Sequence, residues 1–261
     1  MIGIVEWAEA NGVIGNPADI WTAYCNSDTY QAIEEYLREH SGAARAHLVM
    51  QAPQSCFFYD DAFWPVSLDS SRTKPSPVPQ LKEMPEGLRQ HLEEDADATE
   101  ELSAHLAECV YVARFRYEWK KGPIVPKLAS DFFQGAERSL DSALTNLLAN
   151  PPNEEAAELS RDTFESALKA LVAALAGLTA KKARQISHQL DELVQGCRPL
   201  VDPSISTRLQ AAIGYFPAVH IRYEPSPIRG TRLWKCYSEA YHALFVTLST
   251  TREALEEAEL R

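Results

Sequence analysis

The sequence lacks long hydrophobic runs and the short motifs that mark several common enzyme folds. No segment approaches the roughly 18 consecutive apolar residues of a membrane-spanning helix, so we expect no such helix. The Gly-x-x-x-x-Gly-Lys-Ser/Thr loop and the His-Glu-x-x-His pair are absent, as are Gly-x-Gly-x-x-Gly and Gly-x-Ser-x-Gly. These absences argue against an ATPase with a phosphate-binding loop and against a metalloprotease.

Cysteine is scarce, and its spacing carries no metal-binding pattern. The five cysteines are widely scattered, form no Cys-x-x-Cys pair and have no histidine at a zinc-finger interval. We therefore expect reduced thiols, no bound metal and no other cofactor. Residues 1–7 lack a basic leader followed by a long apolar run, the pattern of a secretory signal, so we expect a cytoplasmic protein.

Positive charge is also in short supply. The 261 residues include 25 Lys and Arg against 37 Asp and Glu, which gives a formal net charge of −12. This charge repels phosphate backbones at long range, so any nucleic-acid contact requires a local basic patch. The apolar fraction of 45% and the charged fraction of 24% are those of a soluble globular protein, and the length fits one large or two small domains.

The first region, residues 1–125, has a mixed α+β pattern. Its alternating aromatic and polar residues indicate strands, and its acidic stretch indicates one or two helices with a solvated face. We expect a helix at 27–39, strands at 47–50 and 109–119, an aromatic cluster at 56–64, a loop at 67–85 and acidic helices within 83–108.

The second region, residues 126–261, is uniformly helical in pattern. Apolar residues recur with the helical period, and Gly or Pro separates the segments. Helices joined by such short turns tend to pack antiparallel, so we expect an all-α, up-and-down bundle of four to five helices. The expected helices begin near residues 130, 153, 179, 204 and 231 and, except for the last, end near 150, 177, 196 and 213.

The order of motifs in this second region resembles the HEPN family of helical domains. The resemblance covers roughly residues 127–255. It is carried by Ala136-Glu137-Arg138-Ser139-Leu140, Leu168-Lys169-Ala170-Leu171, His188-Gln189-Leu190-Asp191-Glu192-Leu193, and the pair Arg222-Tyr223 before the last helix.

This resemblance implies a small helical bundle that often forms homodimers and occurs in prokaryotic toxin–antitoxin and phage-defence systems. Many members are metal-independent endoribonucleases, with an active-site Arg followed after four to six residues by a His. Here the nearest match, Arg184 to His188, is one residue short. The resemblance therefore leaves open whether this protein is an enzyme.

The candidate site residues are cationic and lie mostly in the predicted helix at 179–196. Arg184 and His188 are four residues apart and would share a helix face, where they could hold a phosphate or act in RNA cleavage. Alternatively, His188 hydrogen-bonds a neighbouring turn and Arg184 is solvated. Further candidates for binding RNA or a nucleotide, each of which could instead be a structural or solubilising charge, are Lys181, Lys182, Arg198 and Arg222.

Two aromatic features complete the pattern. Arg114 and Arg116 alternate with aromatic residues in the predicted strand at 109–119, as on a platform for single-stranded nucleic acid or on an ordinary sheet face. Trp234, Tyr237 and Tyr241 form a stripe on the last helix that could meet a partner chain.

Two functions are consistent with the sequence. The first is a HEPN-like component of a prokaryotic stress or defence system that handles RNA or nucleotides. The second is a non-catalytic scaffold whose acidic helix docks a basic protein partner.

Overall fold

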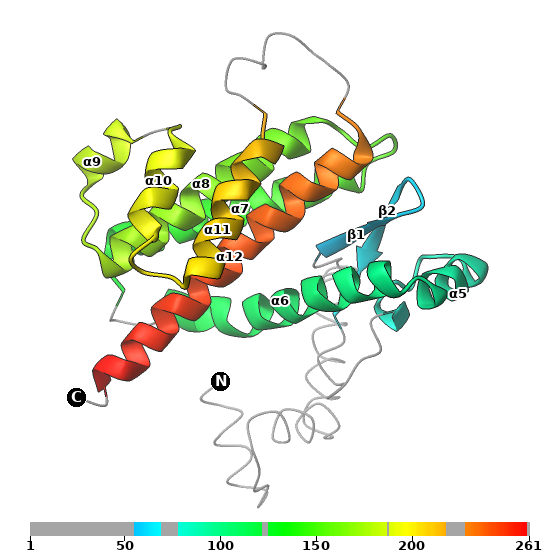
Figure 1. Ribbon diagram of the computed structural model, residues 1–261, viewed down its shortest axis with the longest axis horizontal. Coiled ribbons are helices and arrows are strands. Elements are labelled where there is room, and N and C mark those ends of the chain that lie inside the picture. The colour runs from blue at the N-terminus through cyan, green and yellow to red at the C-terminus, as the bar shows by residue number, and fades with distance from the viewer. Residues whose placement is uncertain (1–54, 69–77, 122–124, 187, 218–227, 260–261) are drawn as a thin grey trace, which may run out of the picture. The chain divides into compact units, whose positions relative to one another are not determined.

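The computed structural model describes residues 55–68, 78–121, 125–186, 188–217 and 228–259. These residues are mostly helical, with a small two-stranded sheet near their N-terminal end, which confirms the predicted fold class (Figure 1). The predicted helix at 27–39 and strand at 47–50 lie outside the described residues. Among the described helices, none is long and apolar enough to cross a membrane.

An antiparallel hairpin occupies the aromatic cluster and is formed by β1 (Ser55–Tyr59) and β2 (Ala62–Val66). Asp60 and Asp61 connect the strands with φ values of 52° and 56°, the positive values that a two-residue hairpin turn requires. The Phe57 ring is buried and meets the Trp234 ring edge-on, with 5.3 Å between their centroids. The hairpin thus packs one face on the helices.

Two acidic helices follow, α5 (Glu86–Glu94) and α6 (Ala96–Lys121), in agreement with the helices predicted within residues 83–108. The Asp95 carboxylate accepts a hydrogen bond of 3.0 Å from the backbone N–H of Ala98, which satisfies one of the free donors at the start of α6. α6 continues to Lys121, so the strand predicted for residues 109–119 is wrong.

The error at 109–119 arises because a short run of aromatic residues satisfies two periodicities at once. The Tyr111 and Phe115 rings, which alternation would place on one face of a strand, also lie one turn apart on a helix, with centroids 4.4 Å apart. The buried apolar residues of α6 follow helical spacing: Leu102, Leu106, Cys109, Val112 and Trp119.

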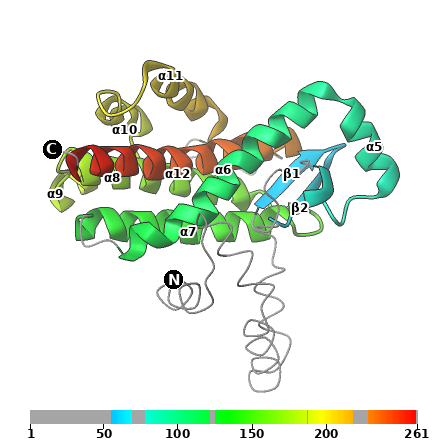
Figure 2. The ribbon, with the colours of Figure 1, turned by 90° about the horizontal axis from the view of Figure 1, so that it is seen from below.

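A helical bundle forms as predicted, from α6, α7 (Lys127–Leu147), α8 (Glu155–Leu175) and α12 (Gly230–Glu259). It differs from the prediction in two ways: it includes α6, which precedes residue 126, and its order is not up-and-down throughout, because α12 is parallel to α8. α7 and α8 are antiparallel neighbours, and the Thr163 hydroxyl of α8 lies 3.4 Å from the Ala136 carbonyl of α7. α12 runs parallel to α8, and its Thr247 hydroxyl donates to the Ala167 carbonyl at 2.9 Å (Figure 2). The parallel order is possible because three short helices separate α8 from α12 in sequence.

These short helices are α9 (Ala180–Gln185), α10 (Leu190–Cys197) and α11 (Pro203–Ala212), and single 3₁₀ turns lie at Val78–Gln80 and Ile213–Tyr215. One hydrophobic core runs through the hairpin, α6 and the other long helices. Residues on both sides of the predicted boundary at 125 therefore share this core.

The aromatic stripe of the last helix is covered within the chain and is not free for a partner. Trp234, Tyr237 and Tyr241 are 3%, 0% and 4% exposed. The His105 ring of α6 packs edge-on against Trp234 and Tyr241, and Phe57 of β1 covers Trp234 from the sheet side. The prediction that this stripe meets a partner was wrong because the sequence did not reveal that β1 and α6 would cover it.

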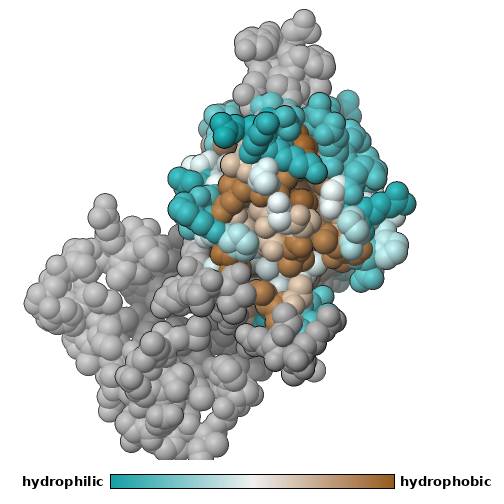
Figure 3. Space-filling model, turned by 90° about the vertical axis from the view of Figure 1, so that its left-hand side faces the viewer, coloured by the Kyte–Doolittle hydropathy of each residue, from teal (hydrophilic) through white to brown (hydrophobic). Residues whose placement is uncertain are grey.

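Apolar residues nevertheless reach the described surface elsewhere. Figure 3 shows the end of the bundle where α9 and the C-terminal end of α12 lie, with a central area of hydrophobic residues that has hydrophilic residues above it and at its sides. The large hydrophobic side chains that are most exposed among the described residues are Val110 at 48% and Tyr215 at 39%.

A buried polar cluster joins the hairpin to α6 and α12. The Ser55 hydroxyl lies 2.7 Å from His105 Nε2 and 3.2 Å from the Tyr237 hydroxyl. Burial lowers the pKa of His105 to about 4, although the charges of Glu108 and Glu101 act in the opposite direction. His105 is therefore neutral in the folded protein at physiological pH.

This lowered pKa makes folding stability depend on pH. An unfolded histidine takes up a proton near pH 6.5, whereas folded His105 does so only near pH 4. The contribution of neutral His105 to the free energy of unfolding is therefore fully present above pH 6.5 and is lost as the pH falls from 6.5 to 4. We expect this loss to be about 3 kcal/mol. Urea unfolding of the wild type and His105→Gln at pH 7 and pH 4 measures it. The variant should lose about 3 kcal/mol less on acidification, and equal losses would contradict the assignment.

Candidate functional site

Three charged side chains are buried on one face of α8 among apolar residues. Arg161, Glu165 and Lys169 are spaced four residues apart, and each is 7% exposed. Lys169 Nζ donates to Glu165 Oε1 at 2.6 Å, and an Arg161 guanidinium nitrogen lies 3.8 Å from Glu165 Oε2. One carboxylate thus faces two buried cations.

The electrostatics of Glu165 follow from these partners. Burial raises the pKa of this carboxyl, but the hydrogen bond from Lys169 and the charges of Lys169, His188 and Arg161 outweigh burial, so its pKa lies below the usual value. Glu165 is therefore an anion at neutral pH. Lys169 Nζ also lies 5.7 Å from the centroid of the Phe132 ring, so an aromatic face shields part of the ammonium group.

His188 lies over this buried carboxylate. Its Nδ1 is 3.3 Å from Glu165 Oε2, and its backbone carbonyl accepts a hydrogen bond of 2.9 Å from Arg161. The backbone φ of His188 is 69°, in the left-handed region that few non-glycine residues adopt. The imidazole is 54% exposed, so it joins the buried charges to the solvent.

The positive φ of His188 also corrects a prediction about the helix. The continuous helix expected over residues 179–196 is wrong: α9 ends at Gln185 and α10 begins at Leu190. The contacts from Arg161 and Glu165 hold His188 in a conformation that an α-helix excludes, so tertiary contacts override the apolar period on which the prediction rested.

The geometry gives the imidazole a defined proton arrangement. An ionised carboxylate only accepts hydrogen bonds, so Nδ1 of His188 carries the proton shared with Glu165. Nε2 is then the nitrogen that can bind a ligand from solution or accept and return a proton. A histidine oriented by a carboxylate in this way suits anion binding or general acid–base chemistry.

The predicted site residues are only partly brought together. Lys181, Lys182 and Arg184 are exposed on α9, and Arg184 Nε donates back to the Ala180 carbonyl at 3.3 Å. Because the helix ends between Arg184 and His188, the two side chains do not share the helix face that we predicted. Arg198 is exposed at the end of α10, and Arg222 lies outside the described residues.

Arg161, Glu165 and Lys169 were not predicted as site residues. The motif at 168–171 drew attention to Lys169 only as part of a family pattern. A stronger signal was available, since three charges at intervals of four share one helix face with apolar residues and must pair with one another or with a neighbouring element.

In the part of the chain that the structure describes, we find neither a metal-binding cluster nor a reactive thiol. No group of three or more His, Cys, Asp or Glu side chains there could hold a metal ion. The four described cysteines are buried free thiols, and burial raises the pKa of Cys109, Cys197 and Cys236 to about 12. These three thiols are protonated at neutral pH and are poor nucleophiles.

We expect Glu165→Gln to destabilise the protein by about 3 kcal/mol, because it leaves the buried charges of Arg161 and Lys169 without a carboxylate. The matched control is Glu256→Gln, which removes an exposed carboxylate paired with Arg252 on α12 and should cost less than about 1 kcal/mol. Urea unfolding measures both. Equal effects would show that the buried charges carry no special weight.

Comparisons of this chain with protein-family models, curated proteins and solved structures find no match. The interpretation of the site therefore depends on its own geometry.

Proposed function

We propose that this protein binds RNA or a nucleotide through the α9–α10 basic segment, defined as Lys181, Lys182, Arg184, His188 and Arg198. The observation that carries the proposal is the exposed His188 imidazole, which the buried Glu165 carboxylate orients and the Arg161 guanidinium fixes through the backbone. In biological terms, we propose a cytoplasmic, HEPN-like component of a prokaryotic stress, toxin–antitoxin or phage-defence system.

The charge distribution supports binding at this place. The whole chain carries a net charge of −12, yet residues 180–198 contain four Lys and Arg against two Asp and Glu. Lys181, Lys182, Arg184 and Arg198 are all exposed, so their charges face the solvent from which a phosphate would approach. A local excess of cations on an acidic protein is what a phosphate-bearing ligand requires.

Cleavage of the bound RNA is the second part of the proposal. The Nε2 atom of His188 is in a position to take a proton from a ribose hydroxyl or return one to a leaving group. Arg184 was the predicted partner for stabilising the phosphate, but its side chain folds back along α9. Of the two predicted catalytic residues, His188 is therefore the one that the geometry favours.

We also propose a homodimer, with a surface other than the aromatic stripe. The apolar area in Figure 3 is the surface that a second copy of the chain would cover.

The scaffold alternative is favoured by a different observation. A series of exposed carboxylates, which a basic partner could contact, lies on α5, on the turn that precedes α5 and on the start of α6. These residues are Glu83, Glu86, Glu93, Glu94, Asp95, Asp97 and Glu100. This surface lies on other elements than the α9–α10 basic segment, so variants can test the two separately.

Removing two charges from the α9–α10 basic segment tests RNA binding. We expect the double variant Lys181→Ser with Lys182→Ser to bind a single-stranded RNA more weakly and to reduce the slope of log affinity against log salt by about 1.4. The control, Lys127→Ser with Arg138→Ser, removes two exposed cations from α7. Fluorescence anisotropy over a salt series measures both. If the two double variants weaken binding equally, the site is wrong.

Replacing His188 tests catalysis. If the protein cleaves total RNA, His188→Ala should lower the rate at least about 100-fold, because a general acid or base contributes that much. His91→Ala is the control, since His91 is exposed on α5. Cleavage unchanged by His188→Ala removes this residue from the mechanism, and the absence of both cleavage and RNA retention favours the scaffold.

A further inference from the structure

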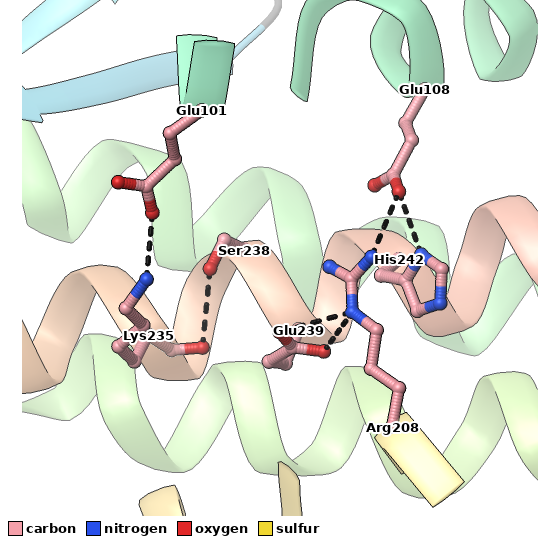
Figure 4. Close-up of polar contacts among 7 residues, drawn as sticks. All are labelled: Glu101, Glu108, Arg208, Lys235, Ser238, Glu239 and His242. Carbon is pink, nitrogen blue, oxygen red and sulfur yellow. Dashed lines mark hydrogen bonds and ion pairs between the residues drawn. The ribbon is translucent and has the colours of Figure 1, made fainter. Parts of the chain in front are cut away.

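A row of polar contacts runs along the seam where α6 and α12 lie side by side (Figure 4). At one end, Lys235 Nζ of α12 donates to Glu101 Oε1 of α6 at 2.7 Å. Two turns further along α6, Glu108 faces His242 of α12, with Oε1 2.7 Å from His242 Nδ1. These contacts hold α6 to α12.

One side chain enters this seam from a third helix. Arg208 of α11 reaches Glu239 of α12 with its Nε 3.0 and 3.2 Å from the two carboxylate oxygens, and its terminal nitrogen lies 3.5 Å from Glu108 Oε1 (Figure 4). The side chains of Glu108 and Glu239 are each 13% exposed, whereas Arg208 is 44% exposed. The guanidinium thus enters from the solvent side into a pair of largely buried carboxylates.

We call this pair of carboxylates the Glu108–Glu239 socket, and both of its carboxylates are carried by the long helices α6 and α12. His242 is 7% exposed and binds Glu108 from α12, so this carboxylate has a second partner besides Arg208. The other imidazole nitrogen, Nε2 of His242, is buried without a hydrogen-bond partner among the described residues. A buried nitrogen without a hydrogen-bond partner destabilises the contact between α6 and α12.

α11 is linked to the proposed functional site through α10. The Gln210 amide of α11 donates to the Asp191 carboxylate of α10 at 2.8 Å. α10 begins two residues after His188 and packs on α8, where Cys197 Sγ lies 3.9 Å from the Leu168 carbonyl. These contacts connect α11 to the segment that carries His188.

We propose that Arg208 in the Glu108–Glu239 socket is a reversible ionic latch that holds the α10–α11 pair on the bundle and so supports the position of His188, which Arg161 and Glu165 fix from α8. Release of Arg208 frees α11 from α12 and loosens α10 from α8. The consequence for RNA binding depends on the proposed function, whereas the latch itself does not.

The latch is tested by the accessibility of Cys197, a fully buried thiol of α10. Native protein is treated with a thiol reagent, and the labelling rate of each cysteine is measured by peptide mass spectrometry. Arg208→Met should raise the rate at Cys197 about tenfold, because local opening exposes α10, and should leave Cys56 and Cys109 unchanged. Arg208→Lys, which restores the charge, should return most of the protection.

The matched control is Lys235→Met, which removes an ion pair between α6 and α12 in the same seam but does not touch α11. It should leave labelling of Cys197 unchanged. In the wild type, 1 M salt should increase labelling of Cys197 selectively, since salt screens a partly exposed ion pair. An unchanged rate in Arg208→Met, or equal increases at Cys56, Cys109 and Cys197, overturns the latch.

RNA binding separates this proposal from the proposed function. Arg208→Met should weaken binding of single-stranded RNA even though Arg208 lies outside the α9–α10 basic segment, while Lys181→Ser with Lys182→Ser should weaken binding without changing the labelling of Cys197. If the wild type binds no RNA, the proposed function fails, and the labelling rates still decide whether the latch exists.

Discussion

The contacts of the Glu165 carboxylate hold together the charged side chains of α8 and the His188 segment that packs on them. This carboxylate neutralises part of the charge of Arg161 and Lys169 inside the bundle and at the same time orients His188. Burying charges in a protein interior is costly unless they are paired, so this group is weak support for stability by itself. The Glu165 group is better explained by conformational specificity. It fixes one backbone conformation for His188, at the point where the apolar pattern predicts a continuous helix.

The helices could be predicted from the sequence wherever a long apolar period repeats. α7, α8 and α11 begin within three residues of their expected starts, and the last helix begins within one. Their caps and breaks are local, as with the Asn153 side chain, which accepts a hydrogen bond from the backbone N–H of Glu155 at the start of α8. Signals of this kind do not depend on the rest of the fold.

The failures share one cause, which is that a distant segment decides the outcome. Residues 109–119 alternate like a strand but are helical because they extend α6, which packs on α12. Residues 179–196 look like one helix but bend at His188, where α8 holds the chain. The aromatic stripe at Trp234 was predicted to be exposed because the sequence around it gives no sign that β1 covers it. Of the candidate site, His188 could be named in advance, but its carboxylate partner 23 residues away could not.

The position of α12 has a consequence for how the chain reaches this structure. α12 contacts β1, α6, α7, α8 and α11, elements that span most of the described sequence. During synthesis those elements emerge first and must wait with their apolar faces uncovered until the last helix leaves the ribosome. Such long-range closure slows folding and exposes partly formed states to aggregation.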